Sequence, residues 1–421
     1  MDVHRQSTQV AKLEDGRLTH LGRIPTTPEA LRAFARTLRR DDHVVLEATG
    51  NTYAIVQVLK QHADRVVVSN PLQTRAIADA KIKTDKIDAE VLVRLLAGGW
   101  LPEVWVPDAD TQALRQRVAH RIRLVRHHVR LKNRIHGVLI RNLVPGCPRA
   151  DLFGQAGHKW LLETAIPQLP EHEQEIVLAT LRQVEAVRAE LGQLGQTLAA
   201  LALQAPAVQR LMTIPGIDAI TALTLVAVIG DVHRFRSPAK LVGYVGLDPR
   251  VRQSGLHTAS HGRITKRGRA YARTALVESA WAAIKSPGPL RGFYQRLRTR
   301  RGPHVAAVAT ARKILVLTWH LLTKEQDYAF MRPSLFAKKR RTLELAAGQP
   351  ARFGTRGVAY EYNLKTVRQR EIALCAQAER AYTQLTHNWQ PQKPQQDAGA
   401  AKGNAPPRRR SATQRGGAFI P

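Results

Sequence analysis

The sequence predicts a multidomain protein with an α/β N-terminal domain, a helical and coiled-coil middle, and a mostly α C-terminal domain. Two apolar runs with the character of buried strands, 43–47 and 65–69, alternate with helical segments near the N-terminus, as in α/β folds. Two long helical patterns follow, and shorter helical patterns dominate beyond residue 209. A chain of 421 residues is too long for one ordinary core, so two or three domains are expected.

The N-terminal α/β domain is expected to cover residues 1–105. Residues 7–13, followed by an Asp-Gly turn, predict a hairpin. A helical segment over 28–39 precedes the first buried strand. Residues 83–96 predict a further helix, because four apolar side chains fall on one face at helical spacing: Ile87, Val91, Leu92 and Leu95.

The middle of the chain, residues 106–206, is expected to contain two long helices. A basic helix over 108–142 ends before two prolines. The second helix, over 171–204, carries a heptad seam with one irregular step: Val177, Leu181, Val184, Val187, Leu191, Leu194, Leu198 and Leu201. This seam predicts a coiled-coil hairpin or a dimerisation arm, and a helix packed on its own domain is about as good an interpretation.

The remainder of the chain divides by composition into three segments. Residues 207–330 predict a mostly helical domain with a Pro215-Gly216 turn between two apolar helices. This turn resembles a helix-hairpin-helix turn, whose free backbone N–H groups can hold a phosphate, although a plain turn between helices explains it equally well. Residues 331–387 are expected to be a helical or irregular extension, and 388–421 a disordered basic tail.

The charge of the chain points to a polyanionic partner. Lysine and arginine number 65 against 33 acidic residues, a net charge of +32 that runs through the whole sequence. Such an excess is typical of proteins that bind DNA or RNA, whereas a basic tail on a neutral enzyme would confine it to one end. Two distant cysteines, Cys147 and Cys375, indicate a reducing cytoplasm without disulfides or zinc. We expect neither a signal peptide nor an apolar run of about 20 residues that could span a membrane.

Acidic residues occupy positions where α/β domains commonly bind ligands. Glu47 closes a predicted strand, and Asp85 and Asp88 begin a predicted helix on one face. Asp2 lies in the first predicted strand. Four converging carboxylates would repel one another unless a hard cation lay between them, and Mg²⁺ prefers such ligands and bridges to phosphate oxygens. Singly, each has an ordinary interpretation as well: a helix cap, a complement to the helix dipole, or a surface residue.

A basic segment of the C-terminal domain surrounds a serine. Residues 249–273 contain no acidic residue and seven basic ones: Arg250, Arg252, Arg263, Lys266, Arg267, Arg269 and Arg273. Ser254 lies among them and is followed by Gly255, which would let the backbone approach a nucleic-acid strand. Clustered arginines can polarise a phosphate enough for a serine hydroxyl to attack it. By this argument alone, Thr258 and Ser260 compete with Ser254.

The combined segments resemble the DEDD transposases of bacterial insertion sequences of the IS-110 and IS-1111 type, over roughly residues 1–325. The resemblance is carried by MDVHRQSTQVA, LEATG, SNPLQTRAIADAKIKTDKIDAEVLVRLL and the later PGI and QSG segments. It implies an RNase H-like N-terminal domain, similar to that of the Holliday-junction resolvase RuvC. Four carboxylates would hold Mg²⁺ there: Asp2, Glu47, Asp85 and Asp88. It also implies that Ser254, in an SG motif followed by G-x-I-x-K-x-G at 262–268, attacks DNA and forms a covalent phosphoserine.

The resemblance further implies the partners of the protein. They are double-stranded DNA at the element ends and target, and a structured guide RNA that the element encodes. A homo-oligomer, dimer or tetramer, in the bacterial cytoplasm is also implied. One departure from the family concerns Asp2, because only Met1 precedes it. We therefore expect an in-frame upstream extension of roughly 5–20 apolar residues ending in glycine, since a strand that carries a ligand needs neighbours on both sides, and Asp2 is the least secure ligand.

Two other functions stay open on the sequence. A metal-only junction resolvase would use the carboxylates for cleavage and Ser254 only to bind phosphate. A nonenzymatic nucleic-acid organiser would explain the charge, but it has no use for carboxylates clustered among phosphates.

Overall fold

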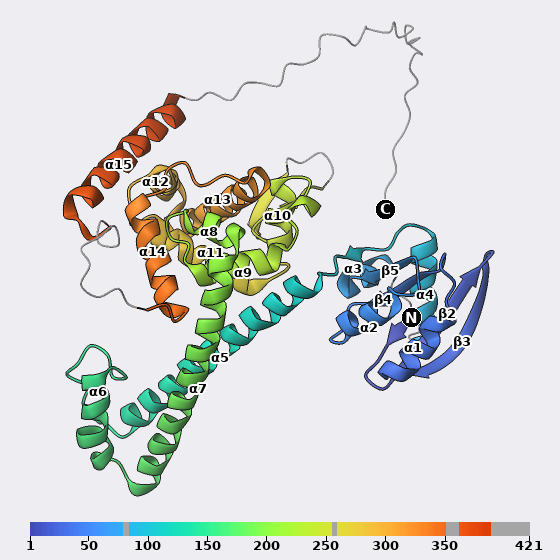
Figure 1. Cartoon of the computed structure of the whole chain (residues 1–421), viewed down its shortest axis with the longest axis horizontal. Helices are drawn as coiled ribbons and strands as arrows, with labels where there is room; N and C mark the ends of the chain where they lie inside the picture. The colour runs from blue at the N-terminus through green and yellow to red at the C-terminus, as the bar shows by residue number, and fades with distance from the viewer. Residues whose placement is uncertain (79–83, 255–258, 351–361, 389–421) are drawn as a thin grey trace, which may run out of the picture.

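The computed structural model describes residues 1–78, 84–254, 259–350 and 362–388. An α/β unit at the N-terminus is joined by a long helix to a larger helical body (Figure 1). The protein is therefore mixed α/β and mostly helical. Within the α/β unit the elements are β1 (Asp2–Val3), β2 (Ser7–Glu14), β3 (Arg17–Pro25), α1 (Pro28–Arg36), β4 (His43–Glu47), α2 (Thr52–Leu59), β5 (Arg65–Ser69), α3 (Pro71–Ile77), α4 (Asp85–Ala97) and β6 (Glu103–Val104).

The strands of the N-terminal unit form two small sheets over one core. One sheet has the antiparallel order β1-β2-β3, and in the other β4 pairs in parallel with β5, which pairs antiparallel with β6. The amine of Met1 donates to the carbonyl of Val45 at 2.8 Å, which ties β1 to β4. Met1, Val3 and Leu46 belong to a single apolar cluster. β1 therefore lies between the two sheets, and its short length does not leave it frayed.

The strongest local signals in the sequence are confirmed in this unit. Both Val-rich strands and the hairpin across the Asp-Gly turn form as predicted. The predicted helix over 83–96 begins at Asp85, after the side chain of Thr84 accepts from the amide of Ile87. Helices α2 and α3 were not predicted, because each is under nine residues long and shows too few turns for a helical period to emerge.

Two long helices form an arm that projects from the helical body (Figure 1). They are α5 (Ala109–Arg141) and α7 (Glu171–Gln204), close to the predicted bounds, with α6 (Gln155–Trp160) at the far end. Val177, Leu181 and Val184 of the heptad seam pack in one cluster with Leu131 and Ile135 of α5. The later seam residues, among them Leu198, belong to the core of the helical body. The seam thus makes an intramolecular helical hairpin at one end and packs on its own domain at the other.

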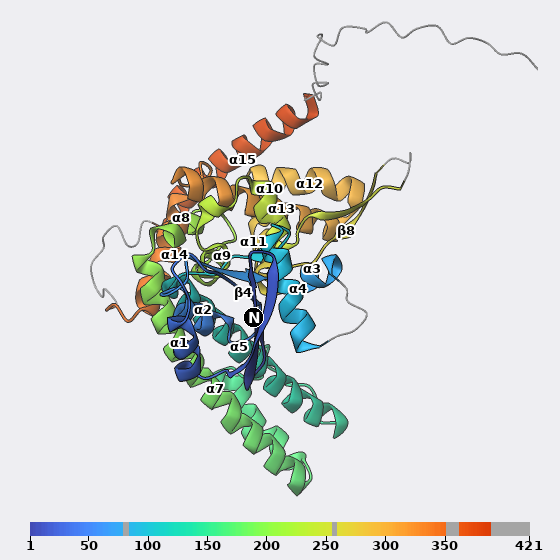
Figure 2. The same ribbon diagram turned by 90° about the vertical axis from the view of Figure 1, so that its right-hand side faces the viewer.

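The helical body contains the largest core. Its elements are α8 (Pro206–Met212), α9 (Ala219–Ile229), α10 (Pro238–Val245), β7 (Pro249–Arg252), β8 (Ser260–Ile264), α11 (Ala270–Ala283), α12 (Pro289–Arg301), α13 (Pro303–Lys324), α14 (Pro333–Ala346) and α15 (Lys365–Asn388). Buried side chains of α8, α9, α10, α11 and α13 form one cluster. Figure 2 shows β8 extending away from these helices. The predicted tail lies, apart from Asn388, outside the described residues.

Helix α13 corrects one expectation from the sequence. Among the described residues, it is the one helix long and apolar enough, by length and composition, to cross a membrane. The sequence was expected to hold no such run. Its side chains Ala306, Thr310 and Ile314 are buried, and Ile314 is part of the large core. This burial is that of a core helix.

Helix α14 is attached to the body through a half-buried lysine. The Nζ of Lys339 donates to the carbonyls of Met212 and Ile214 at 2.7 and 3.0 Å. Burial lowers the pKa of Lys339 from 10.5 to about 8, which the charge of Asp218 partly opposes. Lys339 therefore holds α14 to the turn that precedes α9.

We expect the stability advantage of the native chain over a Lys339→Met variant to rise between about pH 8 and pH 10.5. In this window the folded protein has released the Lys339 proton whereas the unfolded chain still holds it, so raising the pH favours folding. Across this window, the difference in the free energy of unfolding between the two proteins would change by an amount on the order of 3 kcal/mol. Urea denaturation at several pH values measures it. Lys338→Met, which alters an exposed neighbour, should show no such rise.

Candidate active site

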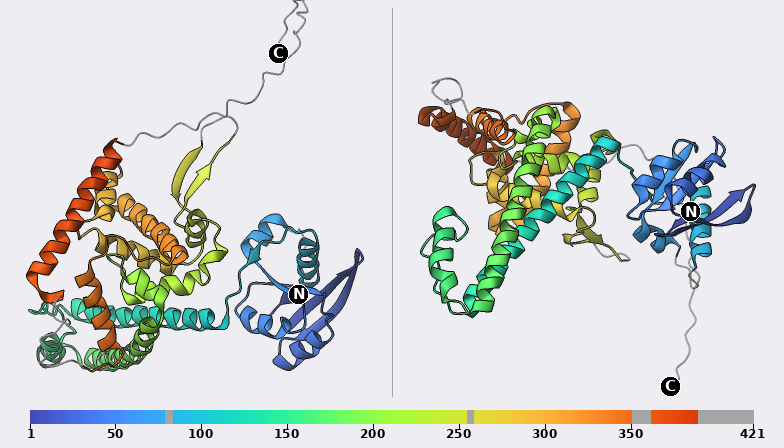
Figure 3. Two further views of the ribbon diagram at one scale, coloured as in Figure 1. Left: turned by 45° about the horizontal axis from the view of Figure 1, so that its top comes forward. Right: turned by 60° about the horizontal axis from the view of Figure 1, so that its bottom comes forward.

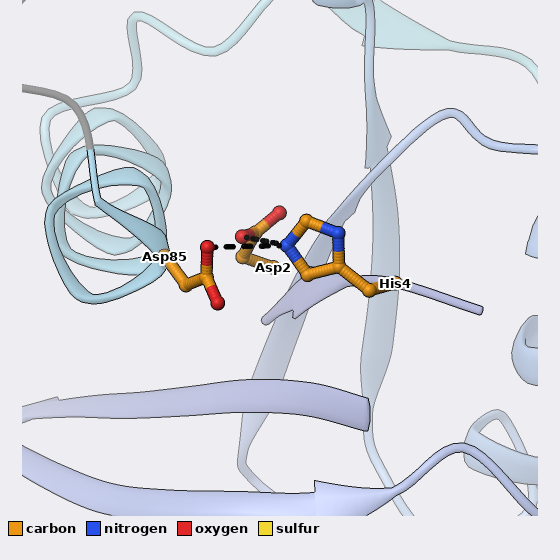
Figure 4. Close-up of side chains that lie close together, drawn as sticks. All are labelled: Asp2, His4 and Asp85. Carbon is orange, nitrogen blue, oxygen red and sulfur yellow. Dashed lines mark hydrogen bonds and ion pairs between the residues drawn. The ribbon is translucent and has the colours of Figure 1, made fainter. Parts of the chain in front are cut away.

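The first candidate group lies where β1 meets the start of α4 (Figure 4). Side-chain atoms of Asp2, His4 and Asp85 all lie within 4.8 Å of one another. The Nε2 of His4 is 3.0 Å from Oδ2 of Asp2 and 3.4 Å from Oδ1 of Asp85. The strand and the helix thus bring together two carboxylates that are 83 positions apart in the sequence (85 − 2).

The side chain of Asp85 is not used to cap its helix. Thr84 caps α4, so capping does not account for Asp85. Asp88 lies one turn further along the same helix. The pKa of Asp2 is raised, first by burial and then by the charges of Asp88 and Asp85, while His4 lowers it. Asp2, Asp85 and Asp88 therefore interact electrostatically.

Glu47, the fourth predicted carboxylate, ends the neighbouring strand. It is half-buried at the last position of β4, and β4 lies beside β1 through the bond from Met1 to Val45. Neither Glu47 nor Asp88 belongs to the group within 4.8 Å. The site therefore consists of a close group of three side chains, with two further carboxylates on adjoining elements.

Two basic side chains that the sequence pattern does not single out contact the aspartates of this group. His4 contacts both aspartates through Nε2, and Nη2 of Arg23 from β3 is 2.7 Å from Oδ2 of Asp85. The spacing of His4 from Asp2, two residues along an extended segment, places both on one face. Nothing local marks Arg23, because its contact depends on how the hairpin packs against α4.

The donor set suits a divalent cation. Carboxylate oxygens are the ligands that Mg²⁺ takes in proteins. Burial is the main cause of the raised pKa of Asp2, and the charges of Asp88 and Asp85 add to it, so a cation between the carboxylates would favour the ionised form. Asp2, Asp85 and Asp88 would hold such an ion, with Glu47 at the end of the next strand. His4 is the one nitrogen donor in the close group.

The second candidate group lies on the β7–β8 hairpin, which projects from the helical body (Figure 3). Ser254 follows β7 by two residues and is exposed. Ser260, its competitor, begins β8 and donates from Oγ to the carbonyl of Arg252 at 3.3 Å. The other competitor, Thr258, and Gly255 lie outside the described residues. The structure thus places Ser254 at the outer end of the hairpin, on a different unit from the carboxylates.

The G-x-I-x-K-x-G motif forms the base of this hairpin. A Cβ at Gly268, where φ is +80°, would lie 2.1 Å from the carbonyl oxygen of Tyr244. A Cβ at Gly246 would lie 2.0 Å from the carbonyl oxygen of Arg267. Ile264 packs against the large core, and Oγ1 of Thr265 contacts Oδ1 of Asp248 at 2.7 Å. The glycines let two backbone segments cross, which sets the direction of the hairpin.

Most of the predicted basic residues surround the hairpin with exposed side chains: Arg250, Arg252, Arg263, Lys266, Arg267 and Arg269. Arg273 differs, because its Nη1 donates to the carbonyls of Val245 and Arg267, at 2.9 Å each. It therefore contributes to the base of the hairpin. The exposed residues have no acidic neighbour within 249–273, which leaves a strongly positive surface.

The turn at Gly216 is packed against another helix. A Cβ at Gly216, where φ is +86°, would lie 2.3 Å from the carbonyl oxygen of Ser279 in α11. The helix that follows is capped by Asp218, whose Oδ1 accepts from the amide of Thr221. Close packing thus accounts for the glycine, and phosphate binding at Gly216 stays a prediction.

We expect Gly268→Ala to destabilise the protein by about 1–3 kcal/mol, because alanine is strained at positive φ and its Cβ would meet the Tyr244 carbonyl. Gly262→Ala is the matched control, since the nearest atom to a Cβ there, the carbonyl oxygen of Arg250, is 3.6 Å away. Thermal unfolding of the two variants measures the difference. Equal melting temperatures would contradict the account of the crossing.

The two groups define a class of protein. The first is an acidic group suited to a divalent cation, and the second is an exposed serine on a basic hairpin. In a chain of net charge +32, these features are typical of an enzyme that acts on nucleic acid. Residues 1–142 match a family model described as "Transposase", of the DEDD type of IS110 elements. Residues 208–295 match the model "Transposase IS116/IS110/IS902 family".

Named relatives agree with these models. A protein named as a transposase in Sinorhizobium fredii is 30% identical over 289 residues, which cover 67% of this chain and 70% of the relative. The transposase for insertion sequence element IS1111A of Coxiella burnetii is 35% identical over 106 residues, 24% of this chain and 29% of its own. A pilin gene-inverting protein of Moraxella lacunata is 26% identical over 300 residues, 68% of this chain and 81% of its own.

This chain belongs to the IS110 family of insertion-sequence transposases. It is a DNA transposase, an enzyme of transposition and DNA recombination, and its substrate is DNA.

Proposed function

We propose that this transposase cuts and rejoins DNA through a covalent phosphoserine on Ser254, beside a Mg²⁺ site formed by Asp2, Glu47, Asp85 and Asp88. The observation that supports it most directly is the close group of Asp2, His4 and Asp85 in a chain whose serine stands exposed on a basic hairpin. On this proposal, residues 1–105 form an RNase H-like metal domain and 207–330 the serine domain.

The chemistry of the serine follows from its surroundings. The Ser254 oxygen would attack phosphorus, and the bond from phosphorus to one deoxyribose oxygen would break, so the energy of the phosphodiester is kept in the protein–DNA bond. The exposed arginines of the hairpin, with Lys266, would bind the phosphate and neutralise charge that develops on it. A bound Mg²⁺ would supply a Lewis acid for the phosphate oxygens and the leaving oxygen. Rejoining is the reverse attack by another deoxyribose hydroxyl.

The site is composite, because the carboxylates and Ser254 belong to different units. We propose that it is completed in a DNA-bound homo-oligomer, dimer or tetramer, and that a structured RNA encoded by the element guides it. The basic helix α5 and the arm that it forms with α7 offer surfaces for the RNA and for a second subunit. Residues 106–206 would then be the assembly segment, with 331–387 as a helical extension.

Covalent trapping tests the proposal. The full chain is incubated with Mg²⁺, guide RNA and a DNA substrate that carries a nick beside the scissile phosphate, so that the broken strand diffuses away and cannot be rejoined. A protein–DNA species that survives denaturant, with the nucleotide mapped to Ser254, is the expected result. Cleavage without such a species would instead favour a metal-only resolvase.

A further inference from the structure

A tryptophan lies in the segment that joins the N-terminal unit to α5. Trp105 follows β6 directly, and α5 begins four residues later. Two guanidinium groups lie over its ring: the Cζ atoms of Arg115 and Arg234 are 4.9 and 4.3 Å from the ring centroid. Both distances are within the range of a cation–π contact. Trp105 thus contacts residues of α5 and of the helical body.

A glycine forms the third wall of this socket. A Cβ at Gly230 would lie 2.3 Å from Cη2 of Trp105. Gly230 ends α9 with φ at +59°, a conformation that L side chains rarely adopt. The ring of Trp105 therefore occupies space that any other residue at position 230 would take.

Both arginines are fixed to the end of the same helix. Arg115 donates to the carbonyls of Ala227 and Val228 at 2.7 and 2.9 Å. Arg234 donates to the carbonyl of Ile229 at 3.0 Å. These carbonyls belong to the last turn of α9 and have no helical partners of their own. The socket is therefore a rigid part of the helical body.

The residue after Trp105 is anchored in the other unit. Val106 packs against the apolar cluster of the N-terminal unit, the cluster that contains Leu46 and Val68. Neighbouring residues in an extended segment point to opposite sides. Two adjacent residues, Trp105 and Val106, thus connect the socket in the helical body with the apolar cluster of the N-terminal unit.

The socket also touches the base of the serine hairpin. The guanidinium of Arg234 lies over the ring of Tyr244, 4.4 Å from its centroid. The carbonyl of Tyr244 is the one that Gly268 approaches where the backbone segments cross. A continuous set of contacts, from Trp105 through Arg234 and Tyr244 to Gly268, therefore joins the linker to the hairpin that carries Ser254.

We infer that Trp105 is a positioning residue for DNA cleavage: docked in its socket, it fixes the orientation of the carboxylate unit relative to the Ser254 hairpin. The expected effect on cleavage rests on the proposed function, whereas the expected effect on the orientation of the two units does not. With Trp105 removed, the carboxylate unit would move on its linker, and the two parts of the composite site would meet less often. A small misplacement of reacting groups can slow a reaction by about 100-fold.

The test combines a distance measurement with cleavage. In a Cys147→Ala, Cys375→Ala background, fluorophores are attached to cysteines at the exposed positions Glu29 of α1 and Lys240 of α10. Trp105→Ala is expected to broaden the energy-transfer distribution and to slow single-turnover cleavage by about 10- to 100-fold. DNA affinity should change less than about 2-fold, since the exposed arginines of the hairpin are untouched. Trp105→Phe, which keeps an aromatic ring in contact with the two guanidiniums, should restore most of both properties.

Trp100→Ala is the matched control. It removes the same side chain five positions earlier, where the tryptophan is 72% exposed, and it should leave distance and cleavage unchanged. If Trp105→Ala lowers the melting temperature, Trp105→Leu replaces it, because leucine fills space without a π face. An unchanged distance distribution, or a broadened one with cleavage at the native rate, would overturn the inference. If Ser254→Ala still cleaved, the proposed function would fail while the distance result stood.

Discussion

The Ser254→Ala protein is expected to form no denaturant-resistant species with DNA and to lose strand cleavage by about 1,000-fold or more. Alanine removes the oxygen that would carry the phosphate. DNA binding should stay within about 2-fold of the native value, because on the proposed function the phosphate contacts would come from the arginines of the hairpin. Gel shift measures binding, and denaturing electrophoresis with peptide mapping measures the adduct.

Ser260→Ala is the matched control for that experiment. Ser260 lies on the same hairpin, and its hydroxyl donates to the carbonyl of Arg252, so it has a structural contact of its own. The adduct should survive this substitution, and Thr258→Ala should also retain it. An adduct mapped to either of these residues would show that the SG motif does not mark the nucleophile. Native cleavage by Ser254→Ala would leave the carboxylates to act alone.

Asp85→Asn is expected to slow cleavage by about 100-fold or more while DNA and RNA binding stay nearly intact. The neutral amide is a poor ligand for Mg²⁺, and a bound divalent cation supplies several kcal/mol of transition-state stabilisation in phosphoryl chemistry. Asp88→Asn should behave in the same way, since its charge acts on Asp2 beside that of Asp85. Cleavage rates across a Mg²⁺ titration, together with Mn²⁺ binding followed by electron paramagnetic resonance, measure the two effects.

The control for Asp85→Asn is Arg23→Gln. Both substitutions remove the ion pair between Arg23 and Asp85, but only the first removes a carboxylate. We expect Arg23→Gln to keep cleavage and Mn²⁺ binding. If Asp85→Asn and Asp88→Asn both cleaved at the native rate in Mg²⁺, these aspartates would serve only to complement the dipole of α4.

The sequence alone determined the elements whose pattern is local and repeated. Runs of valine between charged or turn residues specified β4 and β5 to the residue. Heptad spacing specified α7, because a long helix repeats its apolar face many times. The spacing of Asp85 and Asp88 placed both in the first turn of one helix. In each case the information lies within one segment of the sequence, either in a few neighbouring residues or in a pattern that repeats along one helix.

Only the tertiary structure decided which distant side chains meet. His4 lies against Asp85 and Arg23 against the same carboxylate because a hairpin near the N-terminus packs on α4, and no local period encodes that contact. The socket of Trp105 likewise depends on how α5 crosses the end of α9. Spacing along a chain fixes the face on which a residue lies, whereas its partner across the fold depends on the packing of whole elements.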